Sequence, residues 1–198
     1  MKETTFPAFP PYLDIGCGPT PEKGWVGMDH ETYGRPDIIK WDLTKTPWGL
    51  PDDYFEVVRA SHVLEHIPPS TPDPLYAIVD EVWRILKPGG LFLVTVPWGW
   101  TYASRAHVQH YRDFLPEHFL YFTGENPTFH LTKHKWEPIW RHGWRRQVGS
   151  FDQVMAPHFL LMGKSRLSLT RHLAIRFPFL KPLLTPANEL EVYLYKPL

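Results

Sequence analysis

The chain has 198 residues, one cysteine (Cys17) and 22 prolines, and its 21 basic and 21 acidic residues give a formal net charge of zero. A chain of this size folds as one domain without needing disulfides, and a single cysteine excludes an intrachain disulfide. Zero net charge gives no general electrostatic reason to bind nucleic acid, and no run approaches the ~20 apolar residues of a membrane span. Because the N-terminus also lacks an apolar signal-peptide core, we expect a cytoplasmic protein.

Short apolar runs bounded by Gly, Pro and Asp predict five strands in the first half of the chain. They are residues 12–15, 25–29, 37–42, 55–61 and 91–97. Between the last two, residues 73–90 carry an apolar stripe at helical spacing, which Asp73 and Pro74 start and Gly89 or Gly90 ends. A strand, a helix and a second strand in this order form a right-handed crossover between parallel strands. The pattern predicts an α/β fold with a Rossmann-like, mostly parallel sheet and helices on both faces.

The second half of the chain is less regular. Residues 148–155 and the alternating residues 190–197 predict an antiparallel last strand pair. We therefore expect a single domain over residues 1–198, with a cofactor-binding core at about 11–98, acceptor-side insertions and a C-terminal cap at about 99–188, and a last strand at 189–198.

Ligands of such sheets bind outside the carboxyl ends of the strands, and those ends carry acidic residues here. Asp14 and the segment Gly16–Gly18 follow the first strand, and Asp29 and Asp42 end the next two. A carboxylate accepts hydrogen bonds from ribose hydroxyls or from an amino group such as that of adenine. NAD is disfavoured, because Pro21 stands where the dinucleotide fingerprint needs its third small residue.

The segments "YLDIGCGPTPEKGWVGMDH", "DIIKWDLTKTPWGLPDDYFEVVRASHVLEHI" and "EVWRILKPGGLFLVTVPW" together resemble the class I S-adenosylmethionine-dependent methyltransferases, in particular a short bacterial and phage-like group with a truncated first crossover. The resemblance implies S-adenosyl-L-methionine as cofactor. The residues that it implies around the cofactor are Asp14, Gly16, Cys17 and Gly18 at the methionine end, Asp29 and His30 at the ribose, Asp42 and Leu43 at the adenine, and Ser61 and His62 beside the methyl group. The short first crossover departs from the general family pattern and leaves the holder of the methionine carboxylate unassigned.

The stretch "SHVLEHIPP" contains His62, Glu65 and His66 in the order H-x-x-E-H, which also occurs in zinc proteases. Pro68 and Pro69 follow at once, so any helix there is about one turn long, too short for a zinc-protease helix. We therefore expect no metal. A structural role and a cofactor-lining role for His62 both remain open.

The segment "HYRDFLPEHFLYF" resembles a segment of the same methyltransferase group, and it suggests His110 and Arg112 as catalytic residues. Imidazole can accept the proton of a hydroxyl at neutral pH, so His110 is the candidate general base and His107 the nearby alternative. Trp98, Trp100 and Tyr102 are expected to line an aromatic, uncharged acceptor pocket. The predicted reaction is methyl transfer to a small organic acceptor, such as a hydroxyl of a sugar or natural product. The alternatives are a catalytically silent cofactor-binding partner protein and a nucleic-acid methyltransferase.

Residues 159–184 form a basic amphipathic stretch, and no acidic residue occurs from 153 to 188. Such a stretch can lie on an anionic membrane surface or meet a lipid-linked acceptor. It can equally cap the acceptor site with its charges in solvent. The sequence leaves both interpretations and the oligomeric state open.

Overall fold

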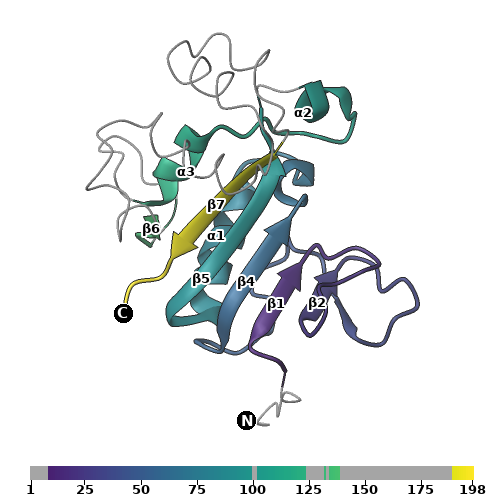
Figure 1. Ribbon diagram of the computed structural model, residues 1–198, viewed down its shortest axis with the longest axis vertical. Helices are drawn as coiled ribbons and strands as arrows, with labels where there is room; N and C mark the ends of the chain where they lie inside the picture. Colours follow the sequence, from purple (N-terminus) through teal and green to yellow (C-terminus); the bar gives the residue numbers. More distant parts are fainter. Residues whose placement is uncertain (1–8, 100–101, 124–131, 133, 139–188) are drawn as a thin grey trace, which may run out of the picture.

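The structure is a computed structural model that describes residues 9–99, 102–123, 132, 134–138 and 189–198. Within them, seven strands form one sheet in the order β3-β2-β1-β4-β5-β7-β6 (Figure 1). The strands are β1 (Tyr12–Ile15), β2 (Val26–Asp29), β3 (Ile38–Lys40), β4 (Phe55–Ser61), β5 (Leu86–Pro97), β6 (Glu137–Pro138) and β7 (Glu189–Tyr195). The helices are the one-turn 3-10 helix η1 (Leu64–His66), α1 (Pro74–Ile85), α2 (Tyr102–Ala106) and α3 (Pro116–Thr123).

The sheet is parallel from β3 to β5 and antiparallel at its other end. β1 pairs with both β2 and β4, and β4 pairs with β5, all in parallel. β7 runs antiparallel to β5 and to β6. The predicted mostly parallel, Rossmann-like sheet with an antiparallel last strand is thus confirmed. Residues 148–155, the expected partner of that strand, lie outside the described residues, so the domain division beyond residue 138 stays a prediction.

Helix α1 forms because its apolar residues recur on one side. Asp73 caps its N-terminus by accepting a hydrogen bond from the Leu75 N–H at 2.9 Å, and Ile78, Val79 and Val82 are completely buried. The helix ends at Ile85, earlier than the sequence predicts. Leu86 is already extended and pairs with Phe55, so the predicted helix end belongs to the start of β5.

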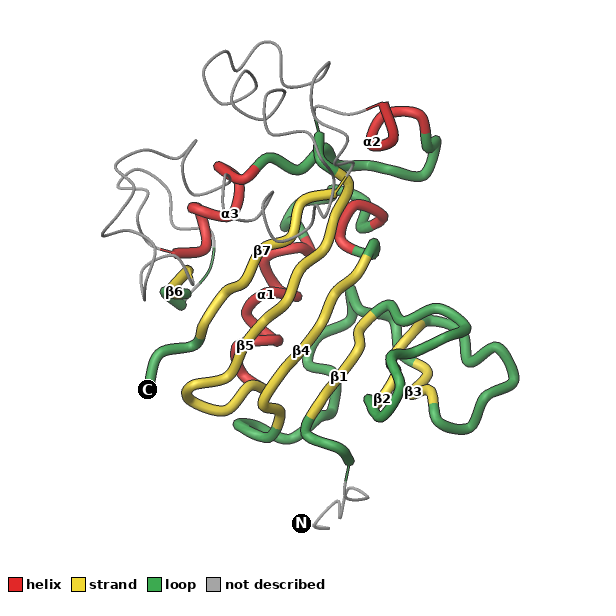
Figure 2. The backbone as a smooth tube through the Cα atoms, in the orientation of Figure 1, coloured by secondary structure: helices red, strands yellow, loops and turns green. Residues whose placement is uncertain are grey.

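Helix α1 lies on one face of the sheet with α3 next to it, α2 lies beyond the ends of the strands, and helical cover on the other face stays a prediction (Figure 1). Figure 2 shows α1 behind β4 and β5, and α3 reaches α1 through the ring contact of Phe122 with Tyr76. The opposite face of β4 and β5 carries half-exposed side chains, among them Arg59 and Leu93. Within the described residues, no helix is long and apolar enough to cross a membrane.

Candidate functional site

The first strand and the second are joined by a loop at the carboxyl end of the sheet, as the truncated crossover predicts. Gly16 donates its N–H to the Met28 carbonyl at 2.7 Å, which ties the start of the loop to β2. Gly16 and Gly18 have φ of 63° and 60°, in the left-handed region that favours glycine. A Cβ on Gly16 would overlap Cγ2 of Val63, whereas a Cβ on Gly18 would meet no atom within 4 Å. Gly18 is therefore where a ligand can approach the backbone.

Asp29 holds this loop with its side chain. The carboxylate is nearly buried and accepts from Gly18 N–H at 2.9 Å with Oδ2 and from Glu31 N–H at 3.2 Å with Oδ1. Nδ1 of His30 lies 2.7 Å from the same Oδ1, although the His30 side chain is otherwise exposed. Each carboxylate oxygen has two lone pairs, so Asp29 retains acceptor capacity for a ligand hydroxyl.

Asp14 lies at the end of β1 and is 3% exposed. Its Oδ2 accepts from the Glu22 N–H at 3.1 Å, and Nε of Arg59 lies 3.8 Å from its Oδ1. Burial is the main cause that raises the pKa of Asp14 above its ordinary value. Burial, with Asp14 and Asp29 as negative neighbours, also raises the pKa of Cys17 to about 11. A cationic group bound at this end of the site would therefore be stabilised by the carboxylates of Asp14 and Asp29.

Asp42 and Leu43 follow β3, at the same edge of the sheet. The N–H and hydroxyl of Thr44 both donate to Oδ1 of Asp42, at 3.0 and 2.7 Å, and the hydroxyl bond lowers the pKa of Asp42. Leu43 is buried, and its carbonyl accepts from Nε1 of Trp48 at 3.0 Å. Asp42 therefore presents a partly exposed carboxylate beside an apolar residue.

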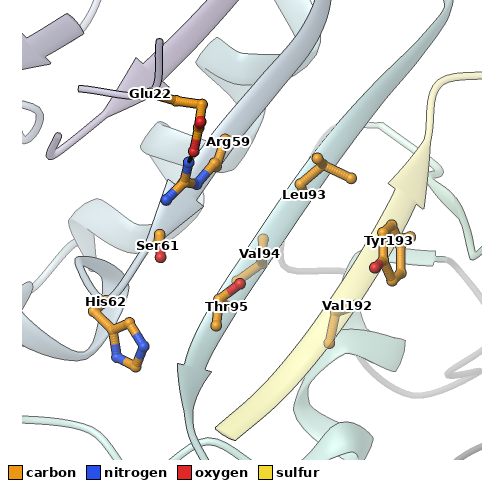
Figure 3. Close-up of a pocket in the computed structure, with 9 residues that line it drawn as sticks. All are labelled: Glu22, Arg59, Ser61, His62, Leu93, Val94, Thr95, Val192 and Tyr193. Atoms are coloured by element: carbon orange, nitrogen blue, oxygen red, sulfur yellow. Dashed lines mark hydrogen bonds and ion pairs between the residues drawn. The ribbon is translucent and has the colours of Figure 1, made fainter. Parts of the chain in front are cut away.

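A cavity of about 430 Å³ lies on the half-exposed face between the β1–β2 loop, β4, β5 and β7 (Figure 3). Glu22, Arg59, Ser61, His62, Leu93, Val94, Thr95, Val192 and Tyr193 line it. Figure 3 shows Arg59 and Glu22 pointing toward one another, with Nη1 and Oε2 2.5 Å apart. Ser61 and His62, at the end of β4, thus share one cavity with the loop that follows β1.

His62 has φ of 55°, and its Nδ1 lies 3.3 Å from Oε1 of the buried Glu65. The H-x-x-E-H stretch forms the single turn η1, which confirms that no long helix occurs there. His62 both contacts Glu65 and lines the cavity, so the structural and the cofactor-lining interpretations are compatible.

The segment that contains His107 and His110 lies against η1. Tyr111 donates its N–H to the Glu65 carbonyl at 2.8 Å, and the His110 ring centroid lies 4.8 Å from that of His66. Nδ1 of His110 lies 2.8 Å from the Ser104 carbonyl, whereas Nδ1 of His107 accepts weakly from Gln109 N–H at 3.3 Å. His66 was considered only together with His62 in the sequence analysis, because both belong to one short motif. Nothing in the sequence indicated that His107 and His110 lie beside His66.

Two other predicted residues have different surroundings from those expected. Arg112 donates to both carboxylate oxygens of Asp73 and to the Ile67 carbonyl, so its contacts are those of a positioning residue. Trp98 is 4% exposed and belongs to the hydrophobic core, so it does not line an open acceptor pocket. Trp100 and the side chain of Tyr102 lie outside what the structure describes.

Residues 20–94 match the model of a family described as "Methyltransferase domain". The matched region runs from the β1–β2 loop to β5 and contains Asp29, Asp42 and Ser61. This region, 75 of the 198 residues, is therefore similar to a methyltransferase domain.

Two relatives have similar descriptions. A Mycolicibacterium smegmatis protein described as a probable S-adenosylmethionine-dependent methyltransferase is 33% identical over 81 residues, which cover 36% of this chain and 29% of that protein. The chain thus matches less than a third of that relative's length. A solved S-adenosylmethionine-dependent methyltransferase from Archaeoglobus fulgidus has the same fold, with a TM-score of 0.56 and 17% identity over 93% of this chain and 85% of the other.

The chain is therefore similar to methyltransferases over part of its sequence, and it shares its fold with a solved S-adenosylmethionine-dependent methyltransferase, as the motifs suggest. Both relatives are described as dependent on S-adenosylmethionine. The structure brings the predicted cofactor residues to one edge of the sheet, from Asp14 on β1 to Asp42 after β3 and Ser61 on β4.

Proposed function

We propose that this protein transfers the methyl group of S-adenosylmethionine to a hydroxyl of a small organic acceptor, such as a sugar or natural product. The observation that supports a hydroxyl acceptor most is the state of His110. Its Nδ1 faces a carbonyl, which can only accept, so Nδ1 carries the proton, and in the neutral ring Nε2 then keeps a lone pair. An imidazole held in this way can serve as a general base.

The cofactor is proposed to lie along the edge from Asp14 to Asp42. Asp29 accepts from the ribose hydroxyls, Asp42 and Leu43 bind the adenine, and Gly16, Cys17 and Gly18 frame the methionine end. Arg59 completes this set, because it is the arginine that lines the cavity and its guanidinium already binds the carboxylate of Glu22. A guanidinium binds carboxylates with two parallel hydrogen bonds, so Arg59 is our candidate for the methionine carboxylate.

In the reaction, the acceptor oxygen forms a bond to the methyl carbon as the bond from sulfur to that carbon breaks. The sulfonium becomes the neutral thioether of S-adenosylhomocysteine, and the hydroxyl proton moves to Nε2 of His110. The protein contributes chiefly orientation of the two reactants, together with proton removal. Arg112 serves this chemistry by fixing the segment that carries His110.

Turnover of a panel of sugar and phenolic hydroxyl acceptors, followed by S-adenosylhomocysteine release, tests the proposal. A positioned base contributes about 10²- to 10⁴-fold, so His110→Ala should slow turnover by such a factor and leave cofactor affinity nearly unchanged. His107→Ala is the matched control. If His107→Ala alone shows the loss, the base is His107; if neither variant does, the hydroxyl-acceptor proposal fails.

The Arg59 assignment has its own test. Arg59→Gln should weaken S-adenosylmethionine binding by about tenfold or more, because a charge-assisted hydrogen bond is lost. Methylthioadenosine, which lacks the methionine carboxylate, should bind both proteins alike. Equal losses for both ligands would contradict the assignment.

Two alternatives remain distinguishable by experiment. A silent partner protein would bind S-adenosylmethionine but turn over no acceptor in a broad panel. A nucleic-acid methyltransferase would bind DNA or RNA with strong salt dependence, because phosphate contacts release counterions. The basic residues 159–184 lie outside the described residues, so contact with an anionic membrane or a lipid-linked acceptor stays a proposal, to be tested by sedimentation with anionic vesicles.

A further inference from the structure

Three histidines from two distant segments come together beside the end of β4. His66 belongs to η1, and His107 and His110 belong to the segment after α2. Their ring centroids are 4.6 to 5.5 Å apart, and one ring nitrogen from each residue lies within 4.8 Å of the other two. A general base needs only one imidazole, so the proposed reaction does not account for this trio.

Hydrogen bonds fix the ring orientation of two members. Nδ1 of His66 lies 3.0 Å from the Gln109 carbonyl, and Nδ1 of His110 lies 2.8 Å from the Ser104 carbonyl. A carbonyl accepts only, so both rings donate from Nδ1 and present the lone pair of Nε2. Histidines that bind metal ions are held in this manner, with the other ring nitrogen donating to a carbonyl or carboxylate.

The backbone around the trio is also fixed. The peptide of Gln109 contacts two of the rings, because its N–H donates to His107 and its carbonyl accepts from His66. The N–H of His110 donates to the His107 carbonyl at 3.1 Å, and Arg112 anchors the next turn of chain to Asp73. The positions of the imidazoles therefore do not depend on their own side-chain preferences alone.

His107 is the adjustable member. It is exposed, whereas His66 and His110 are half-buried, and its Nδ1 accepts the longest of the three hydrogen bonds, at 3.3 Å. Zinc bound to imidazole at about 2.0–2.1 Å in a tetrahedron places neighbouring ligand atoms about 3.4 Å apart. The three nitrogens now lie within 4.8 Å of one another, so metal binding requires the exposed His107 ring to move closer, at the expense of that weak hydrogen bond.

We propose that His66, His107 and His110 bind one divalent transition-metal ion of the zinc type. Three neutral imidazoles suit zinc and its neighbours better than magnesium or calcium, which prefer oxygen ligands. The exposed side of His107 leaves a fourth position for water or a ligand oxygen, as in three-histidine sites with an open coordination position. From its sequence, this protein is expected to bind no metal, because His62 and His66 do not share a long helix; the proposed site departs from that expectation with a different set of histidines.

Binding of the ion excludes one role of His110. The lone pair of Nε2 that would accept a hydroxyl proton would instead be donated to the metal. The metal-loaded protein therefore has no free base at His110, and any help to an acceptor hydroxyl would have to come from the ion itself. Metal binding does not depend on the proposed methyl transfer, so it can be measured without cofactor or acceptor.

The test uses the full chain after dialysis against a chelator. Co²⁺ is added stepwise, and binding is followed by the visible absorption of the bound cobalt. Zn²⁺ serves as competitor, and calorimetry gives the stoichiometry. We expect one ion per chain, displaced by zinc. His107→Gln, at an exposed position that should not disturb folding, and His66→Gln should each weaken binding by at least about tenfold. Thermal unfolding of the metal-free variants checks that they are folded.

Two control variants make the outcome specific. His118→Gln changes a histidine on α3 and should bind cobalt like the unaltered protein. His62→Gln should also bind normally, because His62 is not in the trio. Absence of a stoichiometric site, binding that survives both His66→Gln and His107→Gln, or loss in His62→Gln but not in His107→Gln would overturn the proposal.

Discussion

Arg112 and Asp73 form a two-pronged ion pair between the histidine segment and the start of α1. Nη1 of Arg112 lies 2.8 Å from Oδ2 of Asp73 and Nη2 lies 2.6 Å from Oδ1, and the two side chains are 15% and 18% exposed. Asp73 at the same time caps α1, so one carboxylate holds both the helix and the segment with His107 and His110. The position of the candidate base therefore depends on this pair.

Arg112→Ala should lower the free energy of unfolding by about 2 kcal/mol, because it leaves a largely buried carboxylate without its partner. Arg112→Lys should lower the free energy of unfolding by less than Arg112→Ala does, since lysine keeps the charge but not the two-pronged geometry. Urea denaturation measures both. Arg105→Ala, which removes an exposed partner of Asp113, should cost less than about 1 kcal/mol and serves as control. Equal effects of the two alanine variants would contradict the structural role of Arg112.

Gly16 and Gly18 have almost the same φ but different surroundings, so their alanine variants should behave differently. Gly18→Ala should cost only the left-handed strain, about 1–2 kcal/mol, and the protein should remain folded. Gly16→Ala adds the overlap with Val63, so it should lower the free energy of unfolding by more than about 3 kcal/mol. Thermal unfolding of both variants, and of Gly16→Ala combined with Val63→Ala, checks this. If Val63→Ala gives no rescue, the overlap is not the cause.

Asp29→Ala should weaken both S-adenosylmethionine and S-adenosylhomocysteine, which we expect to bind in the micromolar range. Two charge-assisted hydrogen bonds to the ribose amount to about 3 kcal/mol or roughly a hundredfold in affinity. Calorimetry measures the loss. Asp37→Ala, which removes an exposed carboxylate paired with Arg35, should leave both affinities unchanged. Binding of NAD, or of neither nucleoside, by the unaltered protein would contradict the cofactor site.

Cys17 should resist alkylation at neutral pH. Only the thiolate reacts, and with its pKa raised to about 11 by burial and two carboxylates, roughly one thiol in a thousand is ionised at pH 8. The rate with iodoacetamide should therefore rise about tenfold per pH unit toward pH 11. Mass spectrometry follows the single site directly, with a cysteine peptide as control. A rate that levels off near pH 8.5, as for the peptide, would contradict the raised pKa.

Local patterns in the sequence were sufficient to place β1 to β4 and the second half of β5, whereas the start of β5 and the short β6 were not predicted. The predicted bounds of β1 and β4 match the structure, because Gly16 and the turn before Phe55 interrupt the backbone where the apolar runs stop. The end of α1 was predicted too late. Leu86 continues the helical apolar pattern, but it pairs with Phe55 in the sheet, and this tertiary contact decides its conformation.

Contacts between distant segments could not be predicted in the same way. His66 lies about forty positions before its partners, and contacts between the two segments, such as Tyr111 with Glu65 and His66 with Gln109, bring the three rings together. Trp98 looked like a pocket residue because tryptophan suits both pockets and cores, and its bridge with Phe114 places it in the core. Arg112 was predicted as a catalytic residue, but its hydrogen bonds to Asp73 are those of a residue that positions the segment.

The antiparallel pairing of β5 with β7 has a consequence for how the chain reaches this structure. Leu91 pairs with Tyr195, about a hundred positions later, while the parallel strands β1 to β5 assemble from nearer segments. Until β7 arrives, one edge of β5 exposes unpaired N–H and carbonyl groups on a hydrophobic strand. The slow step of folding should therefore be the closure of this edge, and an intermediate without β7 should be the species that aggregates.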